Sequence, residues 1–298
     1  MAGFRRRTFI GRALAAGIAH MLPHLGSRAA SAASGSSFEV KQLKVKGKHA
    51  SRFDLVVPRT QRGNQPLRLL IALHGLGESG DPEDGAKAWV DRYGLGSALD
   101  RLSTPPVERT TKLAYFSDAR LDEINAALKQ APFAGLAIAC PFTPNFKKEP
   151  DRATAVREYG DWLVNDLLPL ARKESGADTS AANTSIDGCS MGGPYALDTF
   201  LAHPSEFGAV GVVQPAFGAH RAPGYAERLA DAASKNGALR IHLLSSSEDP
   251  FREATETLAK ELSKRKVSHR LRVPQGPHDQ PWLRETGTIE MVLFHEGR

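Results

Sequence analysis

Short apolar runs alternate along the chain with longer amphipathic ones. The first two short runs place apolar and polar residues at alternate positions, which is typical of strands with one exposed face. The later runs are almost continuously apolar, as expected for strands covered on both faces of a sheet. The predicted strands span residues 38–45, 52–58, 67–75, 135–142, 184–190, 208–215, 239–246 and 269–276.

Amphipathic runs with the helical period separate most of these strands. The predicted helices span residues 86–102, 122–131, 157–173, 194–203, 225–235, 252–265 and 282–294. Strands that alternate with helices favour a mostly parallel sheet with helices on both faces. We therefore predict an α/β fold with an eight-stranded sheet, and we expect ligands to bind at the carboxyl ends of its strands.

The composition supports one folded domain. The chain has 298 residues, of which 41% are hydrophobic and 24% charged, enough for one substantial core. Beyond the Ser/Gly/Ala-rich stretch at 31–37 there is no low-complexity linker and no internal repeat, so we predict a single domain over residues 33–298. One connection, at about 78–134, is longer than usual. It either shapes the substrate pocket or adds a surface helix to the sheet.

The positive charge is concentrated at one end of the chain. The formal net charge is +6, from 39 basic and 33 acidic side chains. Residues 1–32 hold five arginines and no acid, which leaves 34 basic and 33 acidic residues, a net of +1, in the remainder. Since that remainder is nearly neutral, we expect no nucleic-acid partner.

The first 32 residues have the order of a targeting signal. A cationic start precedes a weakly apolar run, and Ala30-Ser31-Ala32 offers the small-x-small pattern that signal peptidase cleaves after. The apolar run is too short, and too interrupted by His and Pro, for stable membrane insertion. The segment Arg6 to Ile10 (RRTFI) resembles the twin-arginine export motif, although Arg5 and Gly11 depart from the usual pattern.

This segment predicts export to a periplasm or to the outside of the cell. The twin-arginine machinery, which carries folded proteins, and signal peptidase are the partners expected in transit. A general secretory signal and a simple basic tail are the alternatives.

The stretch DGCSMGGP, residues 187–194, contains a candidate nucleophile, Ser190. It lies where a predicted strand ends and a predicted helix begins, the context of a nucleophile elbow. Gly188 and Gly192 would let strand and helix approach closely around a serine at unfavourable backbone angles. The alternative is a glycine-rich corner without chemistry. Cys189 and Cys140 lie in or at the end of apolar runs, and we interpret both as buried free thiols with a structural role.

The sequence HGLG directly follows the third predicted strand and is a candidate oxyanion loop. In a hydrolase of this architecture, one oxyanion donor comes from this loop and the other from the residue after the nucleophile. This assigns the hole to the backbone amides of Leu76 and Met191, with Gly75 and Gly77 allowing close approach. A simple turn is the alternative, and His74 is interpreted as a structural hydrogen-bonding residue because a catalytic histidine should follow the serine.

The predicted base is His278. It lies in PQGPHDQPW, a loop rich in proline and glycine after the last predicted strand. A base carried on a loop at this edge of the sheet fits the expected order of nucleophile, acid and histidine. His220, in the loop after the sixth strand, is the alternative, as is a structural role for every histidine that follows the serine. The others are His203, His242, His269 and His295.

The predicted acid is Asp249, which follows the seventh predicted strand. A carboxylate at this position would orient the imidazole of the base. Glu248 is the alternative, and it could instead cap the helix that begins near Phe251. Asp279 is adjacent in sequence to the histidine and is interpreted as structural.

At these motifs the chain resembles the putative-esterase branch of the α/β-hydrolases, which includes esterase D-like, feruloyl-esterase-like and mycolyltransferase-like proteins. The resemblance rests on HGLG, EYGDWLVNDLLPLAR, GCSMGG, FGAVGVVQPAFG, SSEDPF and GPHDQPWLRE. It extends over about residues 40–298, is most specific at the elbow and the histidine loop, and is weaker over 78–134. It implies an α/β-hydrolase fold.

Together these observations predict a serine hydrolase that cleaves carboxylic esters of small molecules through an acyl-enzyme. No cofactor is needed, and no Cys/His cluster has the spacing of a metal site. An acyltransferase or a peptidase with the same triad, and an exported binding protein that has lost the chemistry, are the alternatives. The acyl group, the alcohol and the oligomeric state stay open.

Overall fold

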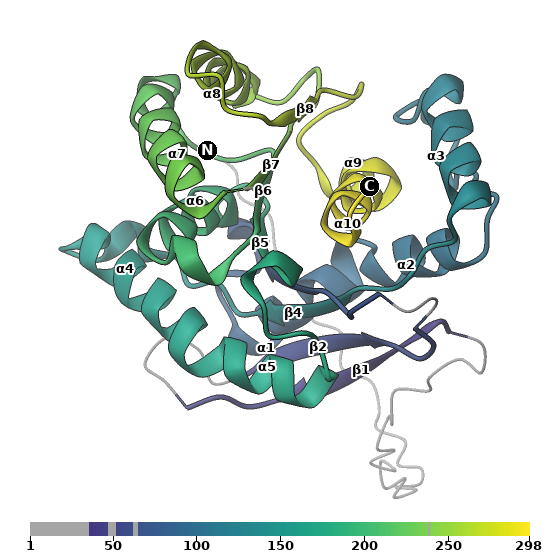
Figure 1. Cartoon of the computed structure of the whole chain (residues 1–298), viewed down its shortest axis with the longest axis horizontal. Coiled ribbons are helices and arrows are strands. Elements are labelled where there is room, and N and C mark those ends of the chain that lie inside the picture. The colour runs from purple at the N-terminus through teal and green to yellow at the C-terminus, as the bar shows by residue number, and fades with distance from the viewer. Residues whose placement is uncertain (1–35, 47–51, 62–64, 238) are drawn as a thin grey trace, which may run out of the picture. The chain divides into compact units, whose positions relative to one another are not determined.

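An eight-stranded sheet forms the centre of the computed structural model, which describes residues 36–46, 52–61, 65–237 and 239–298 (Figure 1). Residues 35–298 make one compact unit, whereas the predicted signal at 1–32 lies outside the described residues. The strands are β1 (Phe38–Leu43), β2 (Phe53–Pro58), β3 (Leu69–Leu73), β4 (Ala137–Pro141), β5 (Thr184–Gly188), β6 (Ala209–Val213), β7 (Arg240–Leu244) and β8 (Arg270–Arg272). Each lies within its predicted range.

The strand order is β1-β2-β4-β3-β5-β6-β7-β8. The β1–β2 and β2–β4 pairs are antiparallel, and all pairs from β4–β3 to β7–β8 are parallel. The predicted mostly parallel sheet is therefore confirmed. Because the parallel strands share one direction, the segments that follow β3, β5, β7 and β8 all begin at the same edge of the sheet. This edge carries the candidate residues.

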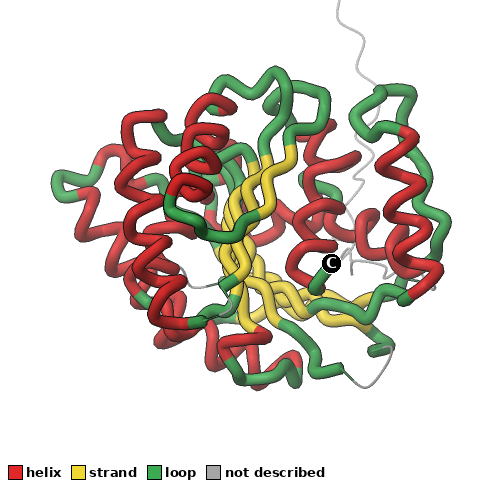
Figure 2. The backbone as a smooth tube through the Cα atoms, turned by 45° about the horizontal axis from the view of Figure 1, so that its top comes forward, coloured by secondary structure: helices red, strands yellow, loops and turns green. Residues whose placement is uncertain are grey.

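Helices cover both faces of the sheet (Figure 2). They are α1 (Pro82–Lys87), α2 (Leu95–Ser103), α3 (Asp118–Gln130), α4 (Arg152–Trp162), α5 (Leu168–Ser175), α6 (Gly192–Ala202), α7 (Ala222–Asn236), α8 (Arg252–Lys264), α9 (Gln280–Trp282) and α10 (Thr288–Glu296). None of these helices combines the length and the apolar character that a membrane crossing requires, within the part of the chain that the structure describes.

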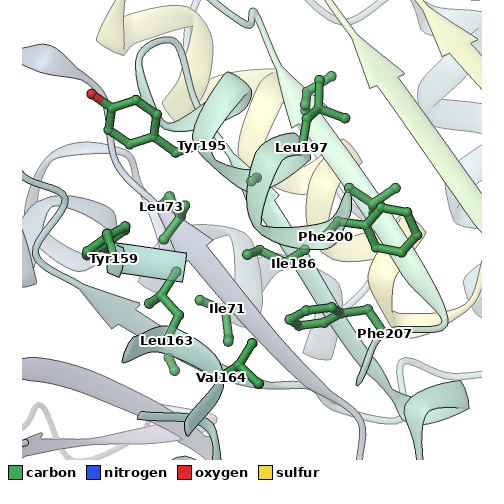
Figure 3. Packing of buried hydrophobic residues seen from close by; sticks show 14 of the residues in the cluster. Ile71, Leu73, Tyr159, Leu163, Val164, Ile186, Tyr195, Leu197, Phe200 and Phe207 are labelled. Carbon is green, nitrogen blue, oxygen red and sulfur yellow. The ribbon is translucent and has the colours of Figure 1, made fainter. Parts of the chain in front are cut away.

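Two hydrophobic cores lie on opposite faces of the sheet, because neighbouring side chains of a strand point to opposite faces. On β3, Ile71 and Leu73 belong to the core under α4 to α8, whereas Leu70 belongs to the core under α2, α3 and α10. Figure 3 shows part of the first core, where Tyr159 and Leu163 approach the sheet residues Ile71 and Ile186, and Phe200 of α6 packs near Phe207.

The prediction of one continuous helix over 86–102 is wrong, because the structure divides this range. Helix α1 ends at Lys87, a π-helical turn spans Ala88–Arg92, and α2 begins after Gly94. Gly94 has a φ of 76°, in the left-handed region, and this interrupts the right-handed helix. A Cβ there would lie 2.9 Å from the backbone of Arg284, so the position also requires glycine. The predicted helix over 157–173 is similarly divided, by a π-helical turn before Pro169, which has no amide hydrogen to donate.

The long connection at 78–134 contributes to the core as well as to the surface. Its α2 and α3 both place buried side chains in the core on their face of the sheet, among them Leu99 and Ile124. Tyr115, which precedes α3, comes close to the histidine loop, since a Cβ on Gly276 would lie 2.9 Å from its ring. The segment therefore forms part of the helical layer and also reaches the edge that carries the candidate site.

Candidate active site

Ser190 lies on a sharp turn between β5 and α6. Its φ is 51°, in the left-handed region that a residue with a side chain rarely adopts. A Cβ added to Gly188 would lie 2.1 Å from the carbonyl oxygen of Gly192, and one added to Gly192 would lie 2.7 Å from that of Leu73. These two glycines are therefore required for the strand, the turn and the helix to pack. The turn is a nucleophile elbow in its geometry.

Neighbouring strands hold this strained turn in place. The amide of Cys189 donates to the carbonyl of Leu73 on β3 (2.9 Å), and the amide of Ser190 donates to that of Val213 on β6 (2.9 Å). The Ser190 carbonyl in turn accepts from Gly193 (3.1 Å) and Ala216 (2.9 Å). The sheet thus over-determines the backbone of the serine, which is how an unfavourable conformation persists in a fold.

The structure brings Ser190, His278 and Asp249 together. The Nε2 atom of His278 is 3.0 Å from the Ser190 Oγ, and its Nδ1 is 2.8 Å from the Asp249 Oδ1. Asp249 is an acceptor when ionised, so Nδ1 carries a hydrogen and Nε2 is free to accept the serine proton. The three side chains form one chain of hydrogen bonds.

The carboxylate of Asp249 is buried and has several donors. Besides His278, it accepts from the Ser245 hydroxyl (2.6 Å) and from the Phe251 amide (2.9 Å). Burial acts to raise the pKa of Asp249, but the hydrogen bonds from His278, Ser245 and Phe251 outweigh it and lower the pKa. The alternative acid, Glu248, is exposed, and it is the side chain of Asp249 that accepts from the amide of Phe251 before α8.

Several contacts position the histidine loop. The amide of Gly276 donates to the Ser247 Oγ (3.1 Å), and the amide of Glu248 donates to the Gly276 carbonyl (3.0 Å). The Nε2 atom of Gln214 donates to the carbonyl of Pro277, directly before the histidine (2.9 Å). Asp279 accepts from the amide of Trp282 (2.9 Å) and so caps α9, a structural role as expected. The loops of the acid and the histidine therefore form one hydrogen-bonded unit.

The HGLG loop packs directly beside the serine. A Cβ on Gly75 would be 3.4 Å from the Ser190 Cβ, so its backbone runs close to the nucleophile. The amides of Leu76 and Met191 donate no hydrogen bond to any residue that the structure describes. Gly77 was predicted to aid the close approach, but a Cβ there would meet nothing within 4 Å. That prediction is wrong, because the position that a side chain at Gly77 would occupy is open space.

His74 does not face the serine. It is fully buried, its Nε2 accepts from the Thr143 amide (2.8 Å), and its Nδ1 is 2.8 Å from the Gly75 carbonyl. Burial lowers the pKa of His74 to about 4. A neutral imidazole that donates from Nδ1 and accepts at Nε2 satisfies both contacts, so His74 fixes the start of the HGLG loop.

The remaining candidates lie in other environments. Cys189 and Cys140 are both buried free thiols, and burial raises the pKa of each, so neither is a reactive thiolate. His220 is exposed in the loop before α7. The other four histidines that follow the serine each have a structural contact: His203 with Asp161 (2.8 Å), His242 with the ring of Phe294 (4.6 Å between centroids), His269 with Val267 (2.9 Å) and His295 with Asp187 (2.8 Å).

Sequence reasoning missed four polar residues that hold the loops of the site. Tyr93 bonds to the HGLG loop, and Glu78 follows that loop and bonds to Tyr93. Gln280 follows the histidine loop, and Gln214, directly after β6, supports that loop. Gln214 has a φ of 47° at the end of its strand. A polar residue between an apolar strand and a proline was the only sequence signal for it. Within the described residues, no group of three or more His, Cys, Asp or Glu could hold a metal ion.

The strand order and the strand-to-helix elbow are those of an α/β-hydrolase. The chain matches the family described as "Putative esterase" over residues 137–288, just over half of its length. It therefore belongs to this esterase family, as the resemblance of its motifs implied. No curated protein matches the sequence of the chain.

Solved structures of esterases share the fold at low sequence identity. A ferulic acid esterase is 14% identical, with a TM-score of 0.63 and coverage of 88% of this chain and 98% of that chain. The CE1 ferulic acid esterase AmCE1/Fae1A from the anaerobic fungus Anaeromyces mucronatus is 15% identical, with a TM-score of 0.60 and coverage of 89% and 92%. The fluorophosphonate-binding serine hydrolase FphF of Staphylococcus aureus is 13% identical, with a TM-score of 0.59 and coverage of 88% and 99%.

Proposed function

We propose that this esterase cleaves carboxylic esters through an acyl-enzyme on Ser190, with His278 as the base and Asp249 as the residue that orients it. The observation that carries the proposal is the unbroken hydrogen-bond chain from the Ser190 Oγ through His278 to a buried, ionised carboxylate. A geometry of this kind lets the imidazole accept a proton while the carboxylate stabilises the resulting charge.

The reaction follows from these contacts. The Nε2 atom of His278 takes the serine proton as Oγ bonds to the ester carbonyl carbon, and the carbonyl oxygen becomes an oxyanion. The intermediate then collapses, the bond to the alcohol oxygen breaks, and the imidazolium returns its proton to the departing alcohol. Water, deprotonated by the same imidazole, releases the acid and restores the serine.

The backbone amides of Leu76 and Met191 are the proposed oxyanion donors. The neighbouring amide of Gly75 already donates to the Tyr93 hydroxyl (3.1 Å), whereas the amide of Leu76, next along the loop, has no acceptor among the described residues. An oxyanion would gain most from donors that have no other acceptor, because they need no reorganisation during the reaction.

Hydrolysis of p-nitrophenyl esters tests this function. The variant Ser190→Ala should lose essentially all turnover, since the nucleophile is gone. The matched control is Cys189→Ala, which removes the adjacent buried thiol and should keep the activity. Equal hydrolysis by wild type and Ser190→Ala, or loss confined to Cys189→Ala, would contradict the assignment.

The same triad is compatible with two other transfers. A competing alcohol acceptor distinguishes an acyltransferase, because the acyl group would then appear on the alcohol instead of in the free acid. Peptide amides assayed beside esters distinguish a peptidase. A binding protein without chemistry would show no Ser190-dependent turnover of any of these substrates. Esterase D-like and feruloyl-esterase-like substrates, with short and aromatic acyl groups, are the first panel to assay.

We also propose that residues 1–32 direct export by the twin-arginine route, from the RRTFI motif and the Ala30-Ser31-Ala32 pattern. Replacing Arg6 and Arg7 together by lysine should leave the precursor uncleaved inside the cell. Continued export of that variant, with processing after residue 32, would instead indicate the general secretory route.

A further inference from the structure

Glu78 is a buried acid close to the candidate site. It lies three residues after Gly75, and only 4% of its surface is exposed. Each of its carboxylate oxygens has one donor: the hydroxyl of Tyr93 donates to Oε2, and the Nε2 of Gln280 donates to Oε1 (2.9 Å). A carboxylate that is nearly excluded from water needs such partners, so the three side chains form a satisfied polar network.

Tyr93 connects this network to the oxyanion loop. Its hydroxyl donates to Glu78 and accepts from the amide of Gly75 (3.1 Å). The phenol is 3% exposed and meets the ring of Trp89 edge-on, with 5.1 Å between centroids. Its backbone carbonyl accepts from the hydroxyl of Thr288 on α10 (2.6 Å). Tyr93 is thus held from two sides, and it fixes the backbone directly before Leu76.

Gln280 connects the same network to the histidine loop. It is the first residue of α9 and lies two residues after His278. Between them, Asp279 caps the helix through the amide of Trp282, so a displacement of Gln280 would move the histidine loop. Glu78 therefore joins the two loops whose separation decides where the oxyanion donor lies relative to the base.

We propose that Glu78, Tyr93 and Gln280 are positioning residues, which together hold the Leu76 amide and His278 in the relative arrangement that the reaction needs. The proposal rests on the proposed function, and it assigns a catalytic purpose to Tyr93, a residue of the long 78–134 connection. Donors of an oxyanion hole act by being already in place, so a small displacement affects the transition state more than the bound substrate.

Three variants test this role. Tyr93→Phe removes the acceptor of the Gly75 amide and the donor of Glu78, and Glu78→Ala removes both acceptors of the network. Glu78→Gln is the conservative variant. Its side-chain carbonyl can accept from Tyr93, and its side-chain amide nitrogen can donate to the carbonyl oxygen of Gln280 once the amide of Gln280 has rotated by half a turn. The matched control is Tyr225→Phe, which removes a buried hydroxyl on α7 whose partners are Arg221 and Asp198.

We expect Tyr93→Phe and Glu78→Ala to lower kcat about 10- to 100-fold. Their KM should stay within about twofold of wild type. The affinity for an arylboronic acid, which forms a tetrahedral adduct with the serine, should fall in parallel with kcat/KM. Glu78→Gln should recover most of the activity, and Tyr225→Phe should keep all of it. For each variant that keeps Ser190, kcat is expressed per active site, counted by complete fluorophosphonate labelling, so that unfolded protein does not contribute.

Wild-type kcat and boronate affinity in Tyr93→Phe and Glu78→Ala would overturn the positioning role. So would a loss in Glu78→Ala that Glu78→Gln does not reduce, because the charge and not the hydrogen-bond network would then matter. Ser190→Ala in the same series tests the proposed function separately. If it is inactive while Tyr93→Phe and Glu78→Ala behave as wild type, only the positioning role fails.

Discussion

Asp249 and Glu248 are adjacent acids in very different environments. Asp249 is buried and bonds to His278, whereas Glu248 is exposed. Asp249→Asn should lower kcat by about 10³- to 10⁴-fold, because the amide can hold the imidazole in the wrong tautomer. Glu248→Gln, the matched control, should change it little. Steady-state kinetics on a p-nitrophenyl ester measures both, and a larger loss in Glu248→Gln would reverse the assignment.

At the residue scale, sequence reasoning singled out candidate residues where a reactive side chain directly follows a strand. Ser190, Asp249 and His278 each follow a strand, and the shared direction of the parallel strands places all three at the same edge of the sheet. Glu78 and Tyr93 were missed, because their network depends on the path of a long connection between two strands. Gly77 was misinterpreted for a related reason, since a glycine pattern does not reveal which way a loop turns.

The elbow depends on the contact between β5 and α6. A Cβ at Gly188 would lie 2.1 Å from the backbone oxygen of Gly192, an overlap that only movement of strand or helix can relieve. Gly188→Ala should therefore lower the free energy of unfolding by about 2 to 4 kcal/mol and abolish activity. Gly77→Ala, in the HGLG loop but with open space around it, should cost less than about 0.5 kcal/mol.

Urea unfolding and ester hydrolysis of these two glycine variants check the prediction. A Gly188→Ala protein as stable and active as Gly77→Ala would contradict the packing described for the elbow.

At the element scale, hydrophobic periodicity located every strand and most helices. It did not reveal the interruption at Gly94, where the chain must turn left-handed against Arg284. It also did not reveal the π-helical turns, of which one precedes Pro169. The interruption and the π-helical turns depend on local backbone geometry, which cannot be predicted from the pattern of apolar residues.

Asp54 links the stability of the whole molecule to pH. It lies on β2, 2% exposed, and burial raises its pKa from 3.8 to about 6, although Arg52 opposes the shift. A raised pKa favours the protonated folded state, so this contribution to stability is present below about pH 4 and is lost as the pH rises through about 6. Asp54→Asn removes the dependence because an amide does not titrate.

The free energy of unfolding of Asp54→Asn, relative to that of wild type, should therefore rise between about pH 4 and pH 7 by on the order of 2 kcal/mol. Urea unfolding at both pH values measures the change. If the free energies of unfolding of the two proteins differ by the same amount at both pH values, Asp54 does not titrate in this range.

At the scale of the whole molecule, alternating strands and helices were sufficient to predict a mostly parallel sheet with two helical layers. The order of the strands was not predicted, because it depends on pairing between distant segments. The comparison with known esterases supports the fold and the family, while the proposed triad rests on the contacts of this chain.

The most direct test of the central claim is covalent labelling by a fluorophosphonate, followed by intact-mass measurement. Wild type and Cys189→Ala should each gain one adduct, and peptide mapping should locate it at Ser190. Ser190→Ala should gain none, and Asp249→Asn should react far more slowly than wild type. Labelling of Ser190→Ala at the wild-type rate, or an adduct at Cys189, would contradict the account.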